Sequence, residues 1–150
     1  MKSCVFFGHR DSIDYAQFST EIEKIIVDLI EKYNVTDFYS GGRGDFDATC
    51  SKIVCKLKKR YPKISVVMVY SYMPSEKSRG AILPAYYDGS VYVLEKRVPQ
   101  KFAILETNKA LVDRCDYVVS GVKYSYGGAY TACAYARKKK KMIFSLFSQQ

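Results

Sequence analysis

Short apolar runs alternate with segments of helically spaced apolar residues along the whole chain. Five runs are typical of buried strands, at residues 4–7, 35–39, 64–70, 117–120 and 142–147, and residues 91–94 are a candidate for a short extra strand. Apolar positions recur at helical spacing over 22–33, 46–57, 99–112 and 129–136. This alternation predicts right-handed parallel βαβ units with helices on both faces of the sheet. We therefore predict a single Rossmann-like α/β domain over residues 1–150, with a mainly parallel sheet of about five strands.

The predicted helices carry recognisable start signals. Thr20 and Glu23 have the spacing of a capping box at the start of the first helix, although Asp11 or Ser12 could begin it earlier. Pro99 is expected to open the third helix, because proline is favoured in the first turn.

The composition fits a globular protein. Of 150 residues, 48% are hydrophobic and 26% charged, with only four Pro and nine Gly, which excludes a disordered or fibrous chain. No apolar run reaches the roughly 20 residues that a membrane span needs. The first run meets Gly8, His9 and Arg10 too early for a signal peptide. We therefore expect a cytoplasmic protein with no membrane partner.

Charge and aromatic content at first suggest a nucleic-acid partner. The net charge is +9, and the chain has 14 Tyr and 8 Phe. Much of the basic excess, however, falls in two clusters, at residues 56–60 and 137–141. Both clusters lie at predicted helix C-termini, where cations complement the helix dipole. These helix ends face away from the sheet edge where a ligand is expected, so the charge becomes a secondary clue.

The number and spacing of the cysteines and the single histidine do not match a metal centre. The five cysteines (Cys4, Cys50, Cys55, Cys115 and Cys133) are widely spaced and odd in number, which favours reduced, buried thiols over disulfides. The single histidine cannot build a Cys/His site with them. We expect no metal and no resident cofactor.

Four loops should gather at one edge of the predicted sheet. In an open parallel sheet, ligands bind at the carboxyl ends of the strands. Glycine-containing or polar loops follow the predicted strands at residues 8–11, 40–47 and 121–128, and a long irregular stretch covers 71–90. Tyrosines near this edge, namely Tyr39, Tyr70, Tyr72 and Tyr126, could stack on a nucleotide base.

The loop at residues 40–47 is the most informative. Its glycines allow positive φ and close approach of a ligand to the backbone, just before a helix whose N-terminus favours an anion. Arg43 could add a charge-assisted contact to a phosphate. Asp45 is either a helix cap or a ligand of ribose hydroxyls, and for Asp47 we favour the cap. The loop matches neither a Walker sequence nor G-x-G-x-x-G.

The loop at residues 121–128 repeats this design, with Gly127 and Gly128 opening the last helix. A tight strand-to-helix turn would also explain these two glycines. His9 and Arg10 follow the first strand and are placed to reach the same ligand, although His9 could instead bond a neighbouring loop. Glu106 is an acid–base candidate, against the commoner alternative of a solvated helix carboxylate.

Four pieces of the chain resemble the SLOG superfamily, the SMF/DprA and LOG group, and above all its small stand-alone bacterial and phage members. They are residues 6–10, 39–47, 108–119 and 135–143. The resemblance implies a Rossmann-like fold that binds nucleotides or nucleotide-derived ligands through its glycine loops. LOG enzymes of this group cleave the N-glycosidic bond of nucleoside 5′-monophosphates.

Two departures from the family pattern weigh against hydrolysis. LOG enzymes have a catalytic glutamate shortly after their glycine pair, whereas Gly127 and Gly128 are followed by Ala129, Tyr130 and Thr131. Related proteins also tend to have arginine just before the position of Asn108, where this chain has Thr107.

Three hypotheses follow. The first is a sensor or sequestering module that binds a nucleotide or an ADP-ribose-like molecule. The second is a LOG-like N-glycosidase, with Asp45, Glu106 or Tyr126 as catalytic candidates. The third is DprA-like nucleic-acid binding, and assembly into a homo-oligomer is left open. The predicted ligand-binding residues are Gly8, His9, Arg10, Ser40, Gly41, Gly42, Arg43, Gly44, Asp45, Gly121, Ser125, Tyr126, Gly127, Gly128 and Thr131.

Overall fold

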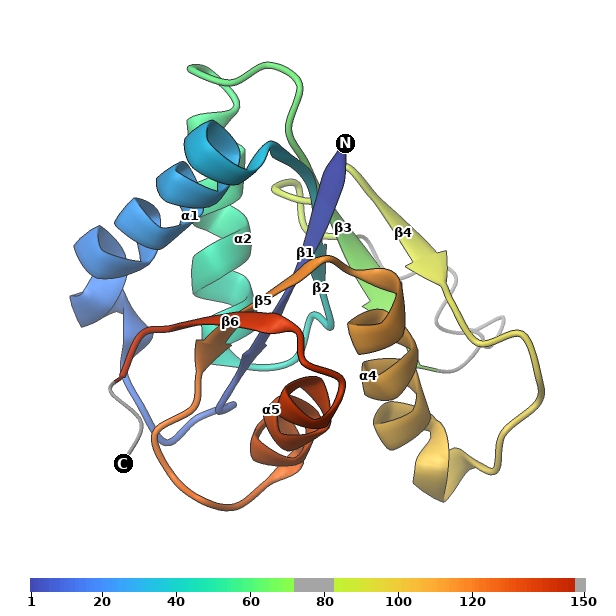
Figure 1. Ribbon diagram of the computed structural model, residues 1–150. Coiled ribbons are helices and arrows are strands. Elements are labelled where there is room, and N and C mark those ends of the chain that lie inside the picture. Colours follow the sequence, from blue (N-terminus) through green and yellow to red (C-terminus); the bar gives the residue numbers. More distant parts are fainter. Residues whose placement is uncertain (72–82, 148–150) are drawn as a thin grey trace.

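The computed structural model describes residues 1–71 and 83–147 and contains a six-stranded, fully parallel sheet (Figure 1). The strand order is β4-β3-β2-β1-β5-β6. The strands are β1 (Lys2–Gly8), β2 (Val35–Ser40), β3 (Ser65–Tyr70), β4 (Gly89–Tyr92), β5 (Tyr117–Gly121) and β6 (Met142–Ser145). The prediction of a Rossmann-like α/β domain is confirmed, and the candidate extra strand is present as β4.

Helices cover both faces of the sheet (Figure 1). One face carries α1 (Ser19–Tyr33) and α2 (Asp45–Leu57), and the other carries α4 (Ala103–Arg114) and α5 (Gly128–Lys138). Two short 3₁₀ helices, η1 (Tyr15–Phe18) and η2 (Gln100–Phe102), precede α1 and α4.

Alternate side chains of the central strand β1 pack into the two hydrophobic cores, one on each face of the sheet. Its Cys4 and Phe6 side chains join the core beneath α1 and α2, whereas Val5 and Phe7 join the core beneath α4 and α5. Successive side chains of a strand point to opposite faces. The continuous apolar run at the start of the chain therefore reflects burial on both faces, as a parallel sheet requires.

The expected capping box at Thr20 and Glu23 is wrong. Helix α1 begins at Ser19, after Phe18, and no side chain caps it. The 3₁₀ helix η1 runs directly into α1, so a carbonyl of η1 accepts the first N–H group: the amide of Ser19 donates to the carbonyl of Ala16. A backbone carbonyl thus accepts the hydrogen bond at the start of α1 that the sequence pattern assigned to a side chain.

Two further boundaries differ from the prediction. Pro99 precedes η2, and α4 proper begins only at Ala103, so the proline opens the region through a 3₁₀ turn. Of the predicted irregular stretch at 71–90, residues 72–82 lie outside the described residues, and β4 already begins at Gly89.

The five cysteines are unpaired, and Cys55 alone among them is partly exposed. Burial raises the pKa of the Cys4 and Cys50 thiols well above the ordinary value, as expected for apolar filler rather than reactive nucleophiles. Among residues 1–71 and 83–147, no group of three or more His, Cys, Asp or Glu side chains is arranged to hold a metal ion. In the same residues, no helix is long and apolar enough to cross a membrane.

Candidate ligand-binding pocket

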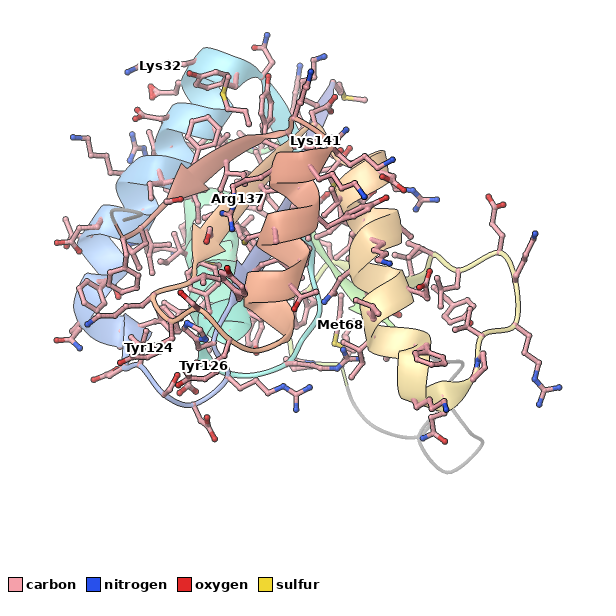
Figure 2. The ribbon with its side chains drawn as sticks, turned by 60° about the horizontal axis from the view of Figure 1, so that its bottom comes forward. Lys32, Met68, Tyr124, Tyr126, Arg137 and Lys141 are labelled. Carbon is pink, nitrogen blue, oxygen red and sulfur yellow. The ribbon has the colours of Figure 1, made fainter. Side chains whose placement is uncertain are left out.

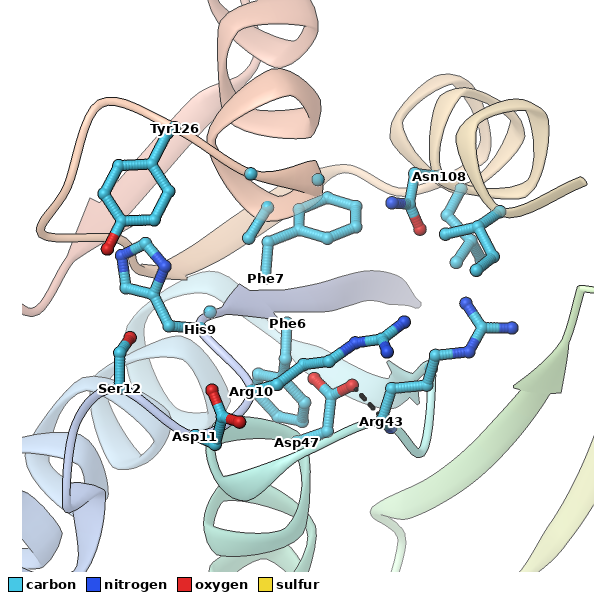
Figure 3. A pocket seen from close by; sticks show the side chains of 17 residues that line it. Phe6, Phe7, His9, Arg10, Asp11, Ser12, Arg43, Asp47, Asn108 and Tyr126 are labelled. Atoms are coloured by element: carbon cyan, nitrogen blue, oxygen red, sulfur yellow. Dashed lines mark hydrogen bonds between the residues drawn. The ribbon is translucent and has the colours of Figure 1, made fainter. Parts of the chain in front are cut away.

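A pocket of about 380 Å³ lies where the carboxyl end of β1 meets the N-termini of α2 and α5. This volume falls within the range of small-molecule sites. Figure 3 shows its lining side chains, which come from the end of β1 and the loop after it, the loop before α2, helix α4 and the start of α5. The predicted ligand-binding residues that line it are Gly8, His9, Arg10, Gly41, Arg43, Tyr126, Gly127 and Gly128.

One aromatic ring packs over the carboxyl ends of β1 and β5 beside the pocket. Phe46, in the first turn of α2, packs over Gly8 and Gly121, which pair with each other in the β1–β5 ladder. A Cβ atom on Gly8 would lie 2.3 Å from the Phe46 ring, and one on Gly121 would lie 2.5 Å from it. The two glycines therefore let helix α2 start directly above the strand ends.

The loop after β1 is bound to the start of α2 by a close backbone contact. The amide of Asp45 donates to the carbonyl of Arg10 over 2.7 Å. Gly44 has φ +92°, and a Cβ there would lie 2.4 Å from the Arg10 Cα atom. Only glycine satisfies both the positive φ and the contact. This contact fixes the backbone from which the Arg10 side chain extends.

Two arginines from different loops reach into the pocket together. The side chains of Arg10 and Arg43 both point toward Asn108 on α4 (Figure 3). Between them lies Asp47, whose Oδ2 accepts a hydrogen bond from the Arg43 amide over 3.0 Å. The arrangement brings two guanidinium groups and one carboxyl group to one wall of the pocket.

Asp47 is only 8% exposed, and this burial has an electrostatic consequence. Burial raises the pKa of Asp47 from 3.8 to about 7, against the opposing effects of the Arg43 amide and of the charges on Arg43 and Arg10. Near neutral pH a large fraction of the Asp47 carboxyl groups is therefore protonated and carries no charge. The expected first-turn position of Asp47 is found, but its hydrogen bond goes to the residue before the N-cap Gly44.

His9 is held in one orientation by the loop after β5. Its Nε2 accepts the backbone N–H groups of Lys123, at 3.0 Å, and Tyr124, at 3.1 Å. The proton of the ring therefore lies on Nδ1, and burial lowers the pKa of His9 below its ordinary 6.5. His9 thus does what the alternative interpretation expected, since it joins two loops, and it also lines the pocket.

The backbone of His9 is anchored as well. Its amide donates to the Tyr15 hydroxyl over 2.9 Å, and that hydroxyl donates to the carbonyl of Gly121 over 2.6 Å. Tyr15 is fully buried, and burial raises its pKa to about 12, so the hydroxyl stays a donor. One buried tyrosine therefore links the ends of β1 and β5 beneath the pocket.

An aromatic stack forms the rim of the pocket at the loop before α5. The ring centroids of Tyr124 and Tyr126 lie 5.6 Å apart, and the angle between the two ring planes is 10°. The His9 ring contacts both, at 5.2 Å from Tyr124 and 6.1 Å from Tyr126. Tyr126 lines the pocket, with 63% of its surface exposed.

Several predicted residues lie beside the pocket rather than in its lining. They either hold neighbouring segments or face solvent. The Ser40 hydroxyl bonds the Tyr87 hydroxyl at 2.9 Å, Gly42 lies against Met68, and the Thr131 hydroxyl donates to the Gly127 carbonyl. The predicted residues outside the lining are Ser40, Gly42, Gly44, Asp45, Gly121, Ser125 and Thr131.

The predicted aromatic and acidic helpers are likewise dispersed. Tyr126 lines the pocket, whereas Tyr39 packs into the core beneath α4 and α5, and Tyr72 lies outside the described residues. Glu106 is a half-buried residue of α4 that forms an ion pair with Lys109 at 3.9 Å, and it is not part of the lining.

Helix α4 contributes a wall that the sequence analysis did not assign to the site. Ile104, Asn108 and Leu111 all line the pocket. Their spacing of four and three residues places them on one helix face, and Asn108 is the polar member of an otherwise apolar stripe. That interruption is the sequence signal that could have identified Asn108. Asp11 and Ser12 also reach the pocket, from the segment considered as a helix start.

Comparisons with known proteins place the fold. No family model matches the chain, and no curated protein matches it. Among solved structures, DNA processing protein A from Helicobacter pylori superposes with a TM-score of 0.64 at 18% identity, over 99% of this chain and 66% of that one. The chain thus spans about two thirds of that relative.

Two further structures agree with this assignment. TM1055, a structural genomics target, superposes with a TM-score of 0.61 at 18% identity, over 95% of this chain and 72% of that one. The molybdenum cofactor carrier protein from Chlamydomonas reinhardtii superposes with a TM-score of 0.53 at 12% identity, over 96% of this chain and 75% of that one. The chain therefore shares an SLOG/DprA–LOG-like fold with these structures, the Rossmann-like fold that the resemblance implied.

Proposed function

We propose that this protein binds a nucleotide or a nucleotide-derived small molecule at the pocket, through the phosphate of that ligand. The observation that carries the proposal is the convergence of Arg10 and Arg43 on one wall. Guanidinium groups bind phosphate through paired, charge-assisted hydrogen bonds. Helices α2 and α5 also begin at this edge, and their free N–H groups favour an anion.

The state of Asp47 supports an anionic ligand. An ionised carboxylate between two arginines would neutralise much of their charge. Because the pKa of Asp47 is raised to about 7, a large fraction of the molecules carries a neutral group there at neutral pH. A neutral Asp47 does not repel a phosphate bound at Arg10 and Arg43.

The structural neighbours are compatible with such a ligand. One is known for its mode of binding single-stranded DNA, and another is a carrier of the molybdenum cofactor. At 12–18% identity these proteins share a fold with the chain, and what they bind is a property of those proteins. Proteins of this fold thus bind a nucleic acid in one case and a cofactor in another, and either kind of ligand is compatible with the proposal.

Isothermal titration tests the proposal. A panel of mononucleotides, dinucleotides and cyclic nucleotides is titrated into the wild type and into Arg10→Met and Arg43→Met. A charged hydrogen bond is worth about 1.5–3 kcal/mol, so each variant should bind about 10- to 100-fold more weakly. The matched control is Arg60→Met, at the far end of α2, which should bind like the wild type. No heat of binding across the whole panel would refute the proposal.

Hydrolysis of a nucleotide stays a second hypothesis. Of the three catalytic candidates Asp45, Glu106 and Tyr126, only Tyr126 lines the pocket. The lining does contain one acid with a raised pKa, Asp47, and such groups concentrate at functional sites. Release of free base from a nucleoside 5′-monophosphate would establish hydrolysis, and unchanged nucleotide after prolonged incubation would exclude it for the nucleotides tried.

Binding of nucleic acid at the basic helix ends is a third hypothesis. Figure 2 shows Lys32 and Lys141 at the end of the molecule opposite Tyr124 and Tyr126. Several cations there have partners: Lys32 pairs with Asp28 at 3.7 Å, and the Lys141 ammonium donates to the Cys115 carbonyl at 2.9 Å. A gel shift that weakens steeply with added salt would support this hypothesis.

A further inference from the structure

Resting on the proposed function, we infer that Tyr126 is a stacking platform for the base of the nucleotide. The ligand would lie across the pocket, with its base on Tyr126 and its phosphate at Arg10 and Arg43. The first support is exposure. Tyr126 leaves 63% of its surface open to solvent and still lines the pocket. A large aromatic ring left open at the rim of a pocket is suited to cover a planar apolar group.

The second support is that the ring is already held in place. Tyr124 stacks on Tyr126 at 5.6 Å with an interplanar angle of 10°. His9 lies against both rings and is itself fixed by the amides of Lys123 and Tyr124. A base that stacks on Tyr126 would extend an existing stack rather than order a mobile side chain. Such preorganisation lowers the entropic cost of binding.

The third support is the layout of the pocket. Figure 3 shows Tyr126 on one side, with the guanidinium groups of Arg10 and Arg43 on the other, beside Asn108. Gly127 and Gly128 follow Tyr126 in the lining, and a Cβ atom on either would meet no atom of another segment within 4 Å. The space beside the stack is therefore open, and the polar wall lies across it. A molecule with a flat base at one end and a phosphate at the other matches this layout.

Base stacking and phosphate binding are separated by two ligands, adenosine 5′-monophosphate (AMP) and ribose 5-phosphate, which lacks the base. Stacking of one base on an aromatic side chain corresponds to about 5- to 100-fold in affinity. We expect the wild type and Tyr126→Phe to bind AMP more tightly than ribose 5-phosphate by that factor. In Tyr126→Leu the two affinities should become equal, because AMP binding weakens and ribose 5-phosphate binding does not change.

A spectroscopic measurement follows the contact directly. The chain contains no tryptophan, so Tyr126→Trp introduces a single tryptophan at the rim, whose fluorescence can be excited selectively over that of the tyrosines. AMP should quench its fluorescence and ribose 5-phosphate should not. The control is Tyr61→Trp, at a residue that bonds Glu31 and is not part of the pocket lining, and its fluorescence should respond to neither ligand.

The outcomes separate the inference from the proposed function. If ribose 5-phosphate binds and AMP binds no more tightly, the stacking inference is wrong and phosphate binding stands. If Tyr126→Leu weakens both ligands equally, Tyr126 supports the loop instead of the base, which also overturns the inference. If neither ligand binds to the wild type, the proposed function fails for mononucleotides, and the inference fails with it. Thermal unfolding of each variant confirms that it is folded.

Discussion

Replacing Asp47 by asparagine should make the stability of the protein less sensitive to a rise in pH from acidic to neutral. Burial raises the pKa of Asp47 from 3.8 to about 7, so folding disfavours the ionised carboxylate. The pKa of Asp47 differs by about three between the unfolded and folded states, which corresponds to about 4 kcal/mol in the free energy of unfolding. Between these two values the unfolded chain has lost the proton and the folded chain keeps it. The contribution is therefore largest below pH 3.8 and is lost as the pH rises through about 7.

The Asp47→Asn variant isolates this contribution because asparagine keeps an oxygen that can accept the hydrogen bond from the Arg43 amide. Urea unfolding at pH 5 and at pH 8 gives the free energy of unfolding of each protein. From pH 5 to pH 8 the wild type should lose about 3 kcal/mol relative to Asp47→Asn, which is the part of the effect between pH 5 and 7. His9, whose pKa is lowered by burial, shifts stability in the opposite direction in both proteins and cancels in the comparison.

The matched control is Asp45→Asn, which removes an exposed acid from the same turn of α2 and so tests the loss of net charge and of the helix-dipole interaction. An equal difference between wild type and Asp47→Asn at both pH values would refute the reasoning. It would mean that the two nearby arginines compensate fully for burial of the carboxylate.

Three further substitutions test the packing around the pocket. Gly121→Ala should destabilise the fold by about 1–3 kcal/mol in urea unfolding, because its Cβ would lie 2.5 Å from the Phe46 ring, whereas Gly89→Ala, with nothing within 4 Å, should change stability little. Tyr15→Phe leaves two buried backbone groups without their hydroxyl partner and should cost about 1–3 kcal/mol by the same measurement, and an unchanged value would show that those groups find other partners. Gly128→Ala meets no protein atom and should stay as stable as the wild type, while its methyl group at the pocket lining weakens nucleotide binding in a titration.

The fold could be predicted from the sequence because its dominant signal is local. The run Cys4–Phe7 is apolar at every position and is closed by Gly8, which is typical of a short strand buried on both faces. Once the strands are parallel, their carboxyl ends must share one edge, so the convergence of the loops follows from topology alone. The start of α1 could not be predicted in this way, because a 3₁₀ turn before Ser19 replaces the side-chain cap expected at Thr20.

The site could be predicted only in part, because its details depend on contacts between distant segments. Arg10 and Arg43 were identified from their positions after strands, and both line the pocket. The wall from α4 was missed, since Asn108 lies in the middle of a helix and is brought to the edge by packing across the sheet. The raised pKa of Asp47 likewise follows from burial, and nothing in the local sequence distinguishes Asp47 from the exposed Asp45.

The two glycine loops look alike in the sequence but have different tasks. In the loop before α2, added Cβ atoms on Gly42 and Gly44 would meet Met68 and the Arg10 backbone, so these glycines are required by contacts within the protein. In the loop before α5, the space around Gly127 and Gly128 holds no protein atom within 4 Å of such a Cβ. The first loop therefore positions the arginines, and the second keeps room beside the aromatic rim. Close approach of a ligand to the backbone, which the sequence suggested for both loops, therefore stays open at Gly41 in the first loop and at Gly127 and Gly128 in the second.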